Sequence, residues 1–69
     1  MPITMEKAGA RVIVKAITGS DKIRAHLADL GFVVGATITV VSKIEKNVIL
    51  QVKESRVALD ESMASRILV

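Results

Sequence analysis

Hydrophobic and polar residues alternate along two neighbouring stretches of the chain, as they do in strands that bury one face. The stretches are Thr37–Lys43 and Val48–Lys53, and the polar tip Glu45-Lys46-Asn47 separates them. We therefore expect a β-hairpin. The residues expected on its buried face are Ile38, Val40, Val48, Leu50 and Val52.

Three further segments are rich in β-branched or alternating apolar residues, which favour strands. They are Arg11–Ile17, Arg56–Leu59 and Arg66–Val69. In the last two, the inward positions are expected to be Val57, Leu59, Ile67 and Val69. Met1 and Met5 precede the first strand, and we expect them at a frayed end of the chain.

One segment, Ser20–Leu30, has the spacing of a helix. Ile23, Leu27 and Leu30 recur at i, i+4 and i+7, which gives a single apolar stripe. Ser20 is a good N-cap, and Gly31 suits the left-handed residue that ends many helices. A second, shorter helical turn is expected over Asp60–Ala64, with Asp60 as its cap.

The predicted order is strand, helix, three strands, helical turn and strand. Such short strands leave exposed edges in an open sheet, and closure into a barrel removes them. We therefore expect a mainly β (α+β) fold: a small SH3-like barrel of about five strands, with the helix covering one end. An OB-like barrel is the alternative, although it favours longer strands. The 69 residues form one domain, 1–69.

The composition narrows the classes of partner. Ten basic and seven acidic residues give a net charge of +3, but the basic residues are scattered, and Phe32 is the only aromatic residue. Small barrels that bind single-stranded nucleic acid stack the bases on exposed aromatic side chains. Because the chain has a single aromatic residue, we expect no nucleic-acid partner. No apolar run is long enough to cross a membrane, and we expect neither membrane insertion nor a secretory signal. The absence of cysteine is compatible with the cytoplasm.

The sequence offers no catalytic constellation. Neither the nucleophile motif Gly-x-Ser-x-Gly nor the phosphate loop Gly-x-x-x-x-Gly-Lys-Ser/Thr is present. The serines have no histidine at a suggestive spacing, and the carboxylates Asp21, Asp60 and Glu61 are explained by helix starts. We expect a protein that is not an enzyme and requires no cofactor.

One pair of residues could hold a divalent metal ion. His26 is the only histidine, and Asp29 follows it by one helical turn. Imidazole and carboxylate are ligands of Fe(II) and Mn(II), but two residues make only half of a site. A surface histidine without a ligand role is the competing interpretation.

Four stretches of the chain, in order, resemble a known family, and the similarity extends from about Lys7 to Val69. The stretches are Asp29-Leu30-Gly31-Phe32-Val33-Val34-Gly35 followed by Ile38 and Val40, Asn47–Lys53, Arg56–Asp60 and Met63–Val69. Together they resemble the FeoA family of bacterial ferrous iron uptake. The chain departs from the family pattern at Val34, where proline is common nearby, and in the short tip Ile44–Asn47.

The resemblance implies an SH3-like cytoplasmic accessory protein of the membrane transporter FeoB, which has a GTP-binding region. Such a protein would modulate transport or GTP hydrolysis by contact. The candidate contact surface is an apolar edge formed by Leu30, Gly31, Phe32 and Val33. For Phe32, a place in the core is the competing interpretation.

Two alternatives remain. The first alternative is a metal-responsive regulatory module, because the same fold type resembles the C-terminal domain of iron- and manganese-dependent repressors. The chain lacks the helix-turn-helix of those repressors, and we expect a free-standing protein. A barrel with an unrelated protein partner is the other. We expect a monomer or a weak homodimer that pairs through the edges Arg11–Ile17 or Arg66–Val69.

Overall fold

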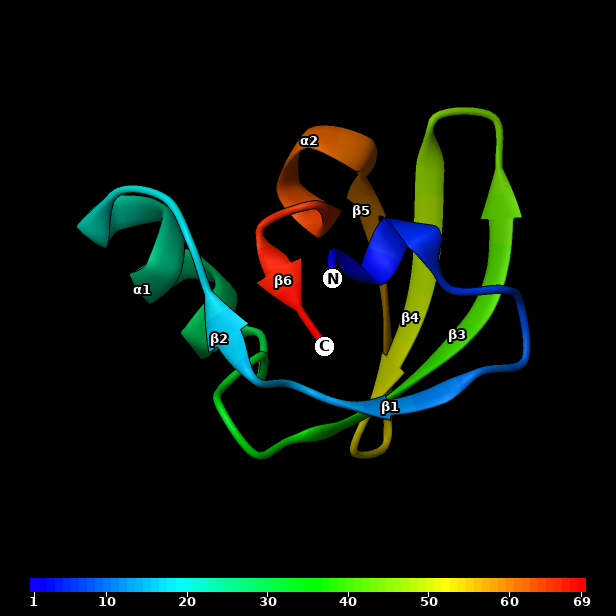
Figure 1. The fold of residues 1–69 in the computed structure, drawn as a ribbon, viewed down its shortest axis with the longest axis horizontal. Coiled ribbons are helices and arrows are strands. Elements are labelled where there is room, and N and C mark those ends of the chain that lie inside the picture. Colours follow the sequence, from blue (N-terminus) through cyan, green and yellow to red (C-terminus); the bar gives the residue numbers. More distant parts are fainter.

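Four antiparallel strands in the order β1-β3-β4-β5 form the main sheet of the computed structural model, which describes residues 1–69 (Figure 1). Strands β2 and β6 form a second, two-stranded antiparallel sheet. The strands are β1 (Arg11–Ile13), β2 (Ala16–Ile17), β3 (Thr37–Ile44), β4 (Asn47–Val52), β5 (Ser55–Asp60) and β6 (Ile67–Leu68). The helices are η1 (Ile3–Met5), α1 (Asp21–Asp29) and α2 (Glu61–Ala64). The SH3-like barrel is confirmed, with six strands in place of about five.

Both hairpins have two-residue turns. Ile44 pairs with Asn47 across the first turn, and Val52 pairs with Ser55 across the second. The first turn residue in each case, Glu45 or Lys53, has a positive φ of about 55° (54° and 55°). Such backbone angles match the twist of the flanking strands in tight hairpins. The hairpin expected from the alternating pattern is therefore confirmed.

The segment Arg11–Ile17, expected as one strand, is two strands in different sheets. Val14 still exchanges hydrogen bonds with the chain before β3, because its N–H donates to the Ala36 carbonyl (2.9 Å). The next N–H, that of Lys15, donates instead to the carbonyl of Leu68 (2.8 Å). The chain changes partner at this point, and the prediction of one continuous strand is wrong for that reason.

The core consists of 13 buried residues, all apolar. They are Ile3, Val14, Leu27, Phe32, Ile38, Val40, Val48, Leu50, Val52, Leu59, Ala64, Ile67 and Val69. Every inward position expected in the first hairpin is among them, and Val57 packs against this core while partly exposed. The alternation of apolar and polar residues in the expected strands thus predicted most of the core residues correctly.

The N-terminal residues are fixed to the barrel, so the expectation of a frayed end is wrong. Ile3 is fully buried in the core. The Met1 ammonium donates to the Val69 carbonyl (2.9 Å), and the Val69 N–H donates back to the Met1 carbonyl (2.8 Å). Pro2 also forms an isolated antiparallel β-bridge with Leu68, whose other side pairs with β2. The expected free edge at Arg66–Val69 is therefore occupied on both sides.

Candidate partner-contact surface

The end of helix α1 determines which side chains of the segment after it are exposed. The helix begins at the N-cap Ser20, whose hydroxyl accepts from the Ile23 N–H (3.2 Å). It ends in a Schellman motif around Gly31, which has a φ of 105°. The Phe32 N–H donates to the Leu27 carbonyl and the Gly31 N–H to the Ala28 carbonyl, both at 2.9 Å. The helix expected over Ser20–Leu30 is confirmed with these caps.

This motif directs Phe32 into the barrel. Phe32 and Leu27 are both 0% exposed, and an apolar contact between these two positions commonly accompanies such a cap. A Cβ on Gly31 would lie 3.1 Å from Cγ2 of Val52, so the turn also rests closely on the end of β4. Phe32 therefore has no exposed surface, and the expectation that it forms part of an exposed apolar edge is wrong.

The segment that follows is exposed and apolar. Val33 is 46% exposed and Val34 is 67% exposed, while Leu30 before them is partly buried. The Ala36 N–H donates to the Val33 carbonyl (3.0 Å), and Gly35 inside this turn has a φ of 91°. Val34 therefore stands at the first central position of a type II-like turn, which points its side chain to solvent.

The same turn is hydrogen-bonded to Val14, the residue that follows β1. The Gly35 N–H donates to the Val14 carbonyl (2.8 Å), and Ile13, the residue before Val14, is 57% exposed. Val34 and Ile13 were not among the expected contact residues. Gly35, a residue typical of turns, could have indicated that its neighbour Val34 is exposed. Ile13 depends on the pairing of distant segments, which no local signal shows.

His26 and Asp29 lie on the exposed surface of α1. Their positions are one turn apart, as expected. No group of three or more His, Cys, Asp or Glu residues in the structure could hold a metal ion. The two residues therefore supply at most part of a metal site, and their ligand role stays a prediction.

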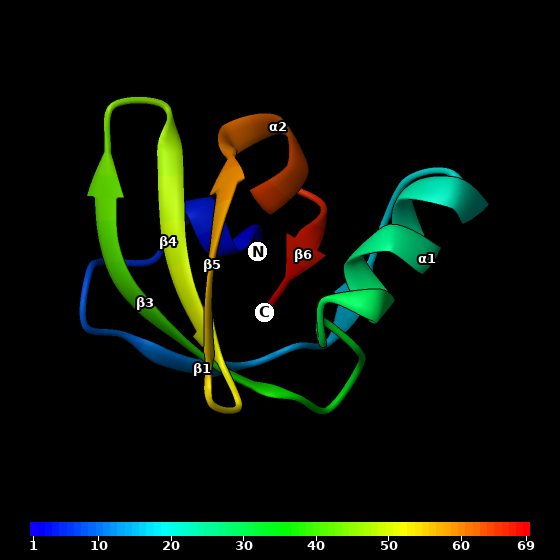
Figure 2. The same cartoon turned by 180° about the vertical axis from the view of Figure 1, so that it is seen from behind.

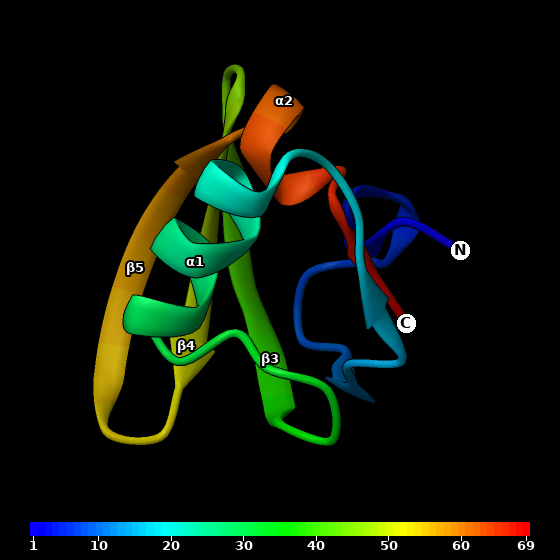
Figure 3. The same ribbon diagram turned by 90° about the vertical axis from the view of Figure 1, so that its left-hand side faces the viewer.

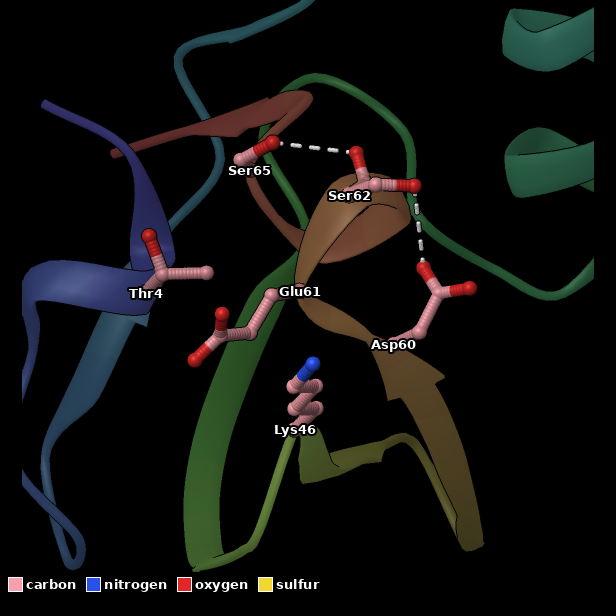
Figure 4. Close-up of a pocket in the computed structure, with 6 residues that line it drawn as sticks. All are labelled: Thr4, Lys46, Asp60, Glu61, Ser62 and Ser65. Carbon is pink, nitrogen blue, oxygen red and sulfur yellow. Dashed lines mark hydrogen bonds between the residues drawn. The ribbon is translucent and has the colours of Figure 1, made fainter.

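The largest hollow on the surface lies elsewhere, between η1, the β3–β4 turn and α2 (Figure 4). It has a volume of about 700 Å³ and no hydrophobic lining; its residues are Thr4, Lys46, Asp60, Glu61, Ser62 and Ser65. Asp60 Oδ1 accepts from the Met63 N–H (2.8 Å) and from the Ser62 hydroxyl (3.2 Å), so its carboxylate caps α2 as expected. The Ser65 hydroxyl donates to the Ser62 carbonyl (2.9 Å). These serines have no histidine beside them in the hollow.

No helix of the structure combines the length and the apolar character that crossing a bilayer requires. No polar or charged residue is buried, and no buried side-chain nitrogen or oxygen lacks a hydrogen-bond partner.

A family model for the FeoA domain matches residues 1–69. The chain belongs to the FeoA family. This is a family of small accessory proteins of ferrous iron transport, and the resemblance inferred from the sequence is confirmed. A search of curated proteins found no match.

Solved FeoA structures share the fold. An iron uptake regulatory protein, FeoA, has 29% sequence identity and a TM-score of 0.90, and the match covers 97% of this chain and 91% of that chain. FeoA from Stenotrophomonas maltophilia complexed with zinc, described as an SH3 domain protein, has 27% identity and a TM-score of 0.86 over 99% and 87% of the two chains.

A manganese-dependent transcriptional repressor also resembles this chain in structure. The TM-score is 0.88 at 14% identity, and the match covers 97% of this chain but 39% of the repressor. This likeness shows a shared fold alone. The expected similarity in fold to the repressors is therefore found, but it does not show that this chain has a repressor-type function.

Proposed function

We propose that this FeoA-family chain is a non-enzymatic accessory protein that binds a FeoB-type ferrous iron transporter and modulates its transport or GTPase cycle. The observation that carries the proposal is that Val33 and Val34 are two exposed apolar residues adjacent in the chain, whereas the other exposed large apolar residues, Met1, Met5, Ile13 and Ile44, have no such neighbour in sequence. Clustered apolar side chains on so small a surface are typical of contact sites. Membership of the FeoA family points to the transporter as the partner.

The contact surface that we propose consists of Leu30, Val33, Val34 and Ile13. Gly31 positions it through its left-handed backbone, and Phe32 anchors it from inside the barrel. This surface replaces the edge expected from the sequence, since Phe32 cannot touch a partner while it is buried. The protein would act in the cytoplasm, where the GTP-binding region of the transporter lies.

The basic residues are scattered over the chain and do not suggest a nucleic-acid-binding site as an alternative to the apolar contact surface. The single aromatic side chain is buried, so bases have no exposed ring on which to stack. The hollow beside α2 has a capping carboxylate and two serines that donate to an acceptor within it. Protein contact remains the function that the surface supports best.

The proposal is tested by titrating the protein against the full-length transporter in nanodiscs, with the isolated GTP-binding region in parallel. We expect saturable binding that weakens at least about tenfold in the Val33→Ser/Val34→Ser variant. Ile44→Ser is the control, because Ile44 is 59% exposed and is the last residue of β3. The turn between β3 and β4 lies at the opposite end of the molecule from α1 (Figure 2). No binding by the folded protein, or equal loss in both variants, would contradict the proposal.

A further inference from the structure

Strand β5 is a free edge of the main sheet. It is the last strand in the order β1-β3-β4-β5, and it pairs only with β4. The following helix, α2, contacts β5 itself as well as β4 and η1, and it is not a strand that pairs with the outer edge of β5. In Figure 3 β5 forms the outer border of the ribbon, with nothing drawn beyond it. The edge at β1 is half as long, three residues against six.

The hydrogen-bond pattern tells which groups of β5 face outward. The Glu61 N–H donates to the Lys46 carbonyl (2.9 Å), so the neighbouring pair Asn47 and Asp60 is of the type without direct hydrogen bonds. This type alternates along the ladder, so Arg56 and Ala58 also belong to it. Their N–H and C=O groups therefore point away from β4, and both residues are exposed.

The charges along this edge are self-complementary. Arg56 and Asp60 lie symmetrically about Ala58, two residues to either side. If two copies of the strand run antiparallel about a two-fold axis at Ala58, each Arg56 stands directly opposite Asp60 of the other copy. Opposite charges at such positions stabilise a sheet, whereas like charges destabilise it.

We propose that β5 pairs with β5 of a second copy of this chain, with Ala58 at the two-fold axis. At the two-fold axis Ala58 faces Ala58 of the second copy, and these small side chains do not obstruct the pairing. Val57 of each copy stands opposite Leu59 of the other. The neighbouring residues of β4, Asn47, Ile49 and Gln51, are uncharged. Within the chain, Arg56 uses Nε to donate to Gln51 Oε1 (3.3 Å) and Asp60 uses Oδ1 to cap α2, so the terminal guanidinium nitrogens and Asp60 Oδ2 are left for the second copy. A single strand thus supplies both halves of the complementary pattern. The pairing does not depend on the transporter.

Sedimentation equilibrium at low salt, at protein concentrations up to about 1 mM, measures this association. One strand pair buries little surface, so we expect a weak dimer. Ala58→Pro removes an outward N–H and no bond to β4, and it should weaken the dimer about tenfold or more. Arg56→Asp places like charges opposite each other and should do the same. Lys53→Asp is the matched control, because the same charge change falls in the turn, and it should leave the dimer unchanged.

NMR of a mixture of labelled and unlabelled protein locates the contact. Val57 and Leu59 of different copies would form the pair without direct hydrogen bonds, so we expect an intermolecular contact between their Hα atoms. Exchange of the Ala58 amide should slow as the protein concentration rises. A chain that stays monomeric, or a dimer that survives Arg56→Asp and shows contacts elsewhere, would overturn the proposal. If Ala58→Pro fails to fold, Arg56→Asp and the NMR contact still decide.

Discussion

The Phe32 N–H donates to the Leu27 carbonyl at 2.9 Å, and both side chains are completely buried. One hydrogen bond therefore links the end of α1 to the centre of the barrel. The next two residues, Val33 and Val34, are consequently the ones that face solvent.

Phe32→Ala should destabilise the protein strongly. Truncating a buried phenylalanine costs about 3–5 kcal/mol, which is a large part of the stability of a small domain. Phe32→Leu should cost less than about 2 kcal/mol, because most of the volume stays filled. Urea unfolding of both variants, with Val34→Ala as an exposed control that changes little, measures these differences. A Phe32→Ala protein as stable as the original would show that Phe32 is not part of the core.

Gly31→Ala should destabilise more than Gly35→Ala. Both glycines have a positive φ, 105° and 91°, which costs other residues about 1–2 kcal/mol. Only at Gly31 would the new Cβ also press on Val52, 3.1 Å away, whereas nothing lies within 4 Å at Gly35. Thermal unfolding of the two variants gives the comparison. Adding Val52→Ala should relieve part of the loss at Gly31 and none of it at Gly35; equal losses throughout would refute the close approach.

Ser20→Ala should cost about 1 kcal/mol, within a range of about 0.5–2, through the loss of the cap on the Ile23 N–H. Ser20→Asp should retain most of the stability, because its carboxylate can accept the same bond and suits the start of a helix. Amide exchange in the first turn of α1 reports the effect locally. If Ser20→Asp loses as much as Ser20→Ala, the hydroxyl contributes by packing and not as an acceptor.

If His26 and Asp29 bind a divalent ion, Mn(II) should broaden the NMR signals of these two residues before those of the rest of the chain. His26→Gln should lower the Mn(II) affinity about tenfold or more, because imidazole is the stronger ligand. Glu45→Gln removes an exposed carboxylate from the β3–β4 turn, which lies at the opposite end of the molecule from α1, and serves as the control. An affinity that His26→Gln leaves unchanged would end the ligand hypothesis.

Local patterns in the sequence predicted the parts of the fold that depend on neighbouring residues. The caps Ser20 and Asp60, the apolar stripe of α1 and the β3–β4 hairpin all follow from short-range spacing. The division of Arg11–Ile17 does not, because the partner of this segment changes from the chain before β3 to β6. A propensity describes a residue and says nothing about which distant segment it meets.

The proposed contact surface shows the same limit. The stretch Leu30–Val33 lies where the sequence indicated, but Phe32 turns inward and Val34 outward because of two successive glycine-dependent turns. Apolar character alone cannot separate a residue that fills the barrel from one that stays outside. Ile13 is included in the proposed surface because the turn at Gly35 is hydrogen-bonded to Val14, the residue that follows Ile13.

The turn at Val33–Ala36 is closed by its own hydrogen bond and anchored to Val14. Its backbone therefore has little freedom left to lose when a partner arrives, and the χ1 angle of a β-branched valine side chain is restricted. The entropy of ordering a loop, which weakens many loop-mediated contacts, is largely absent here. Docking through these valines should proceed in one kinetic phase, with a negative heat-capacity change from apolar burial and no slower step for rearrangement.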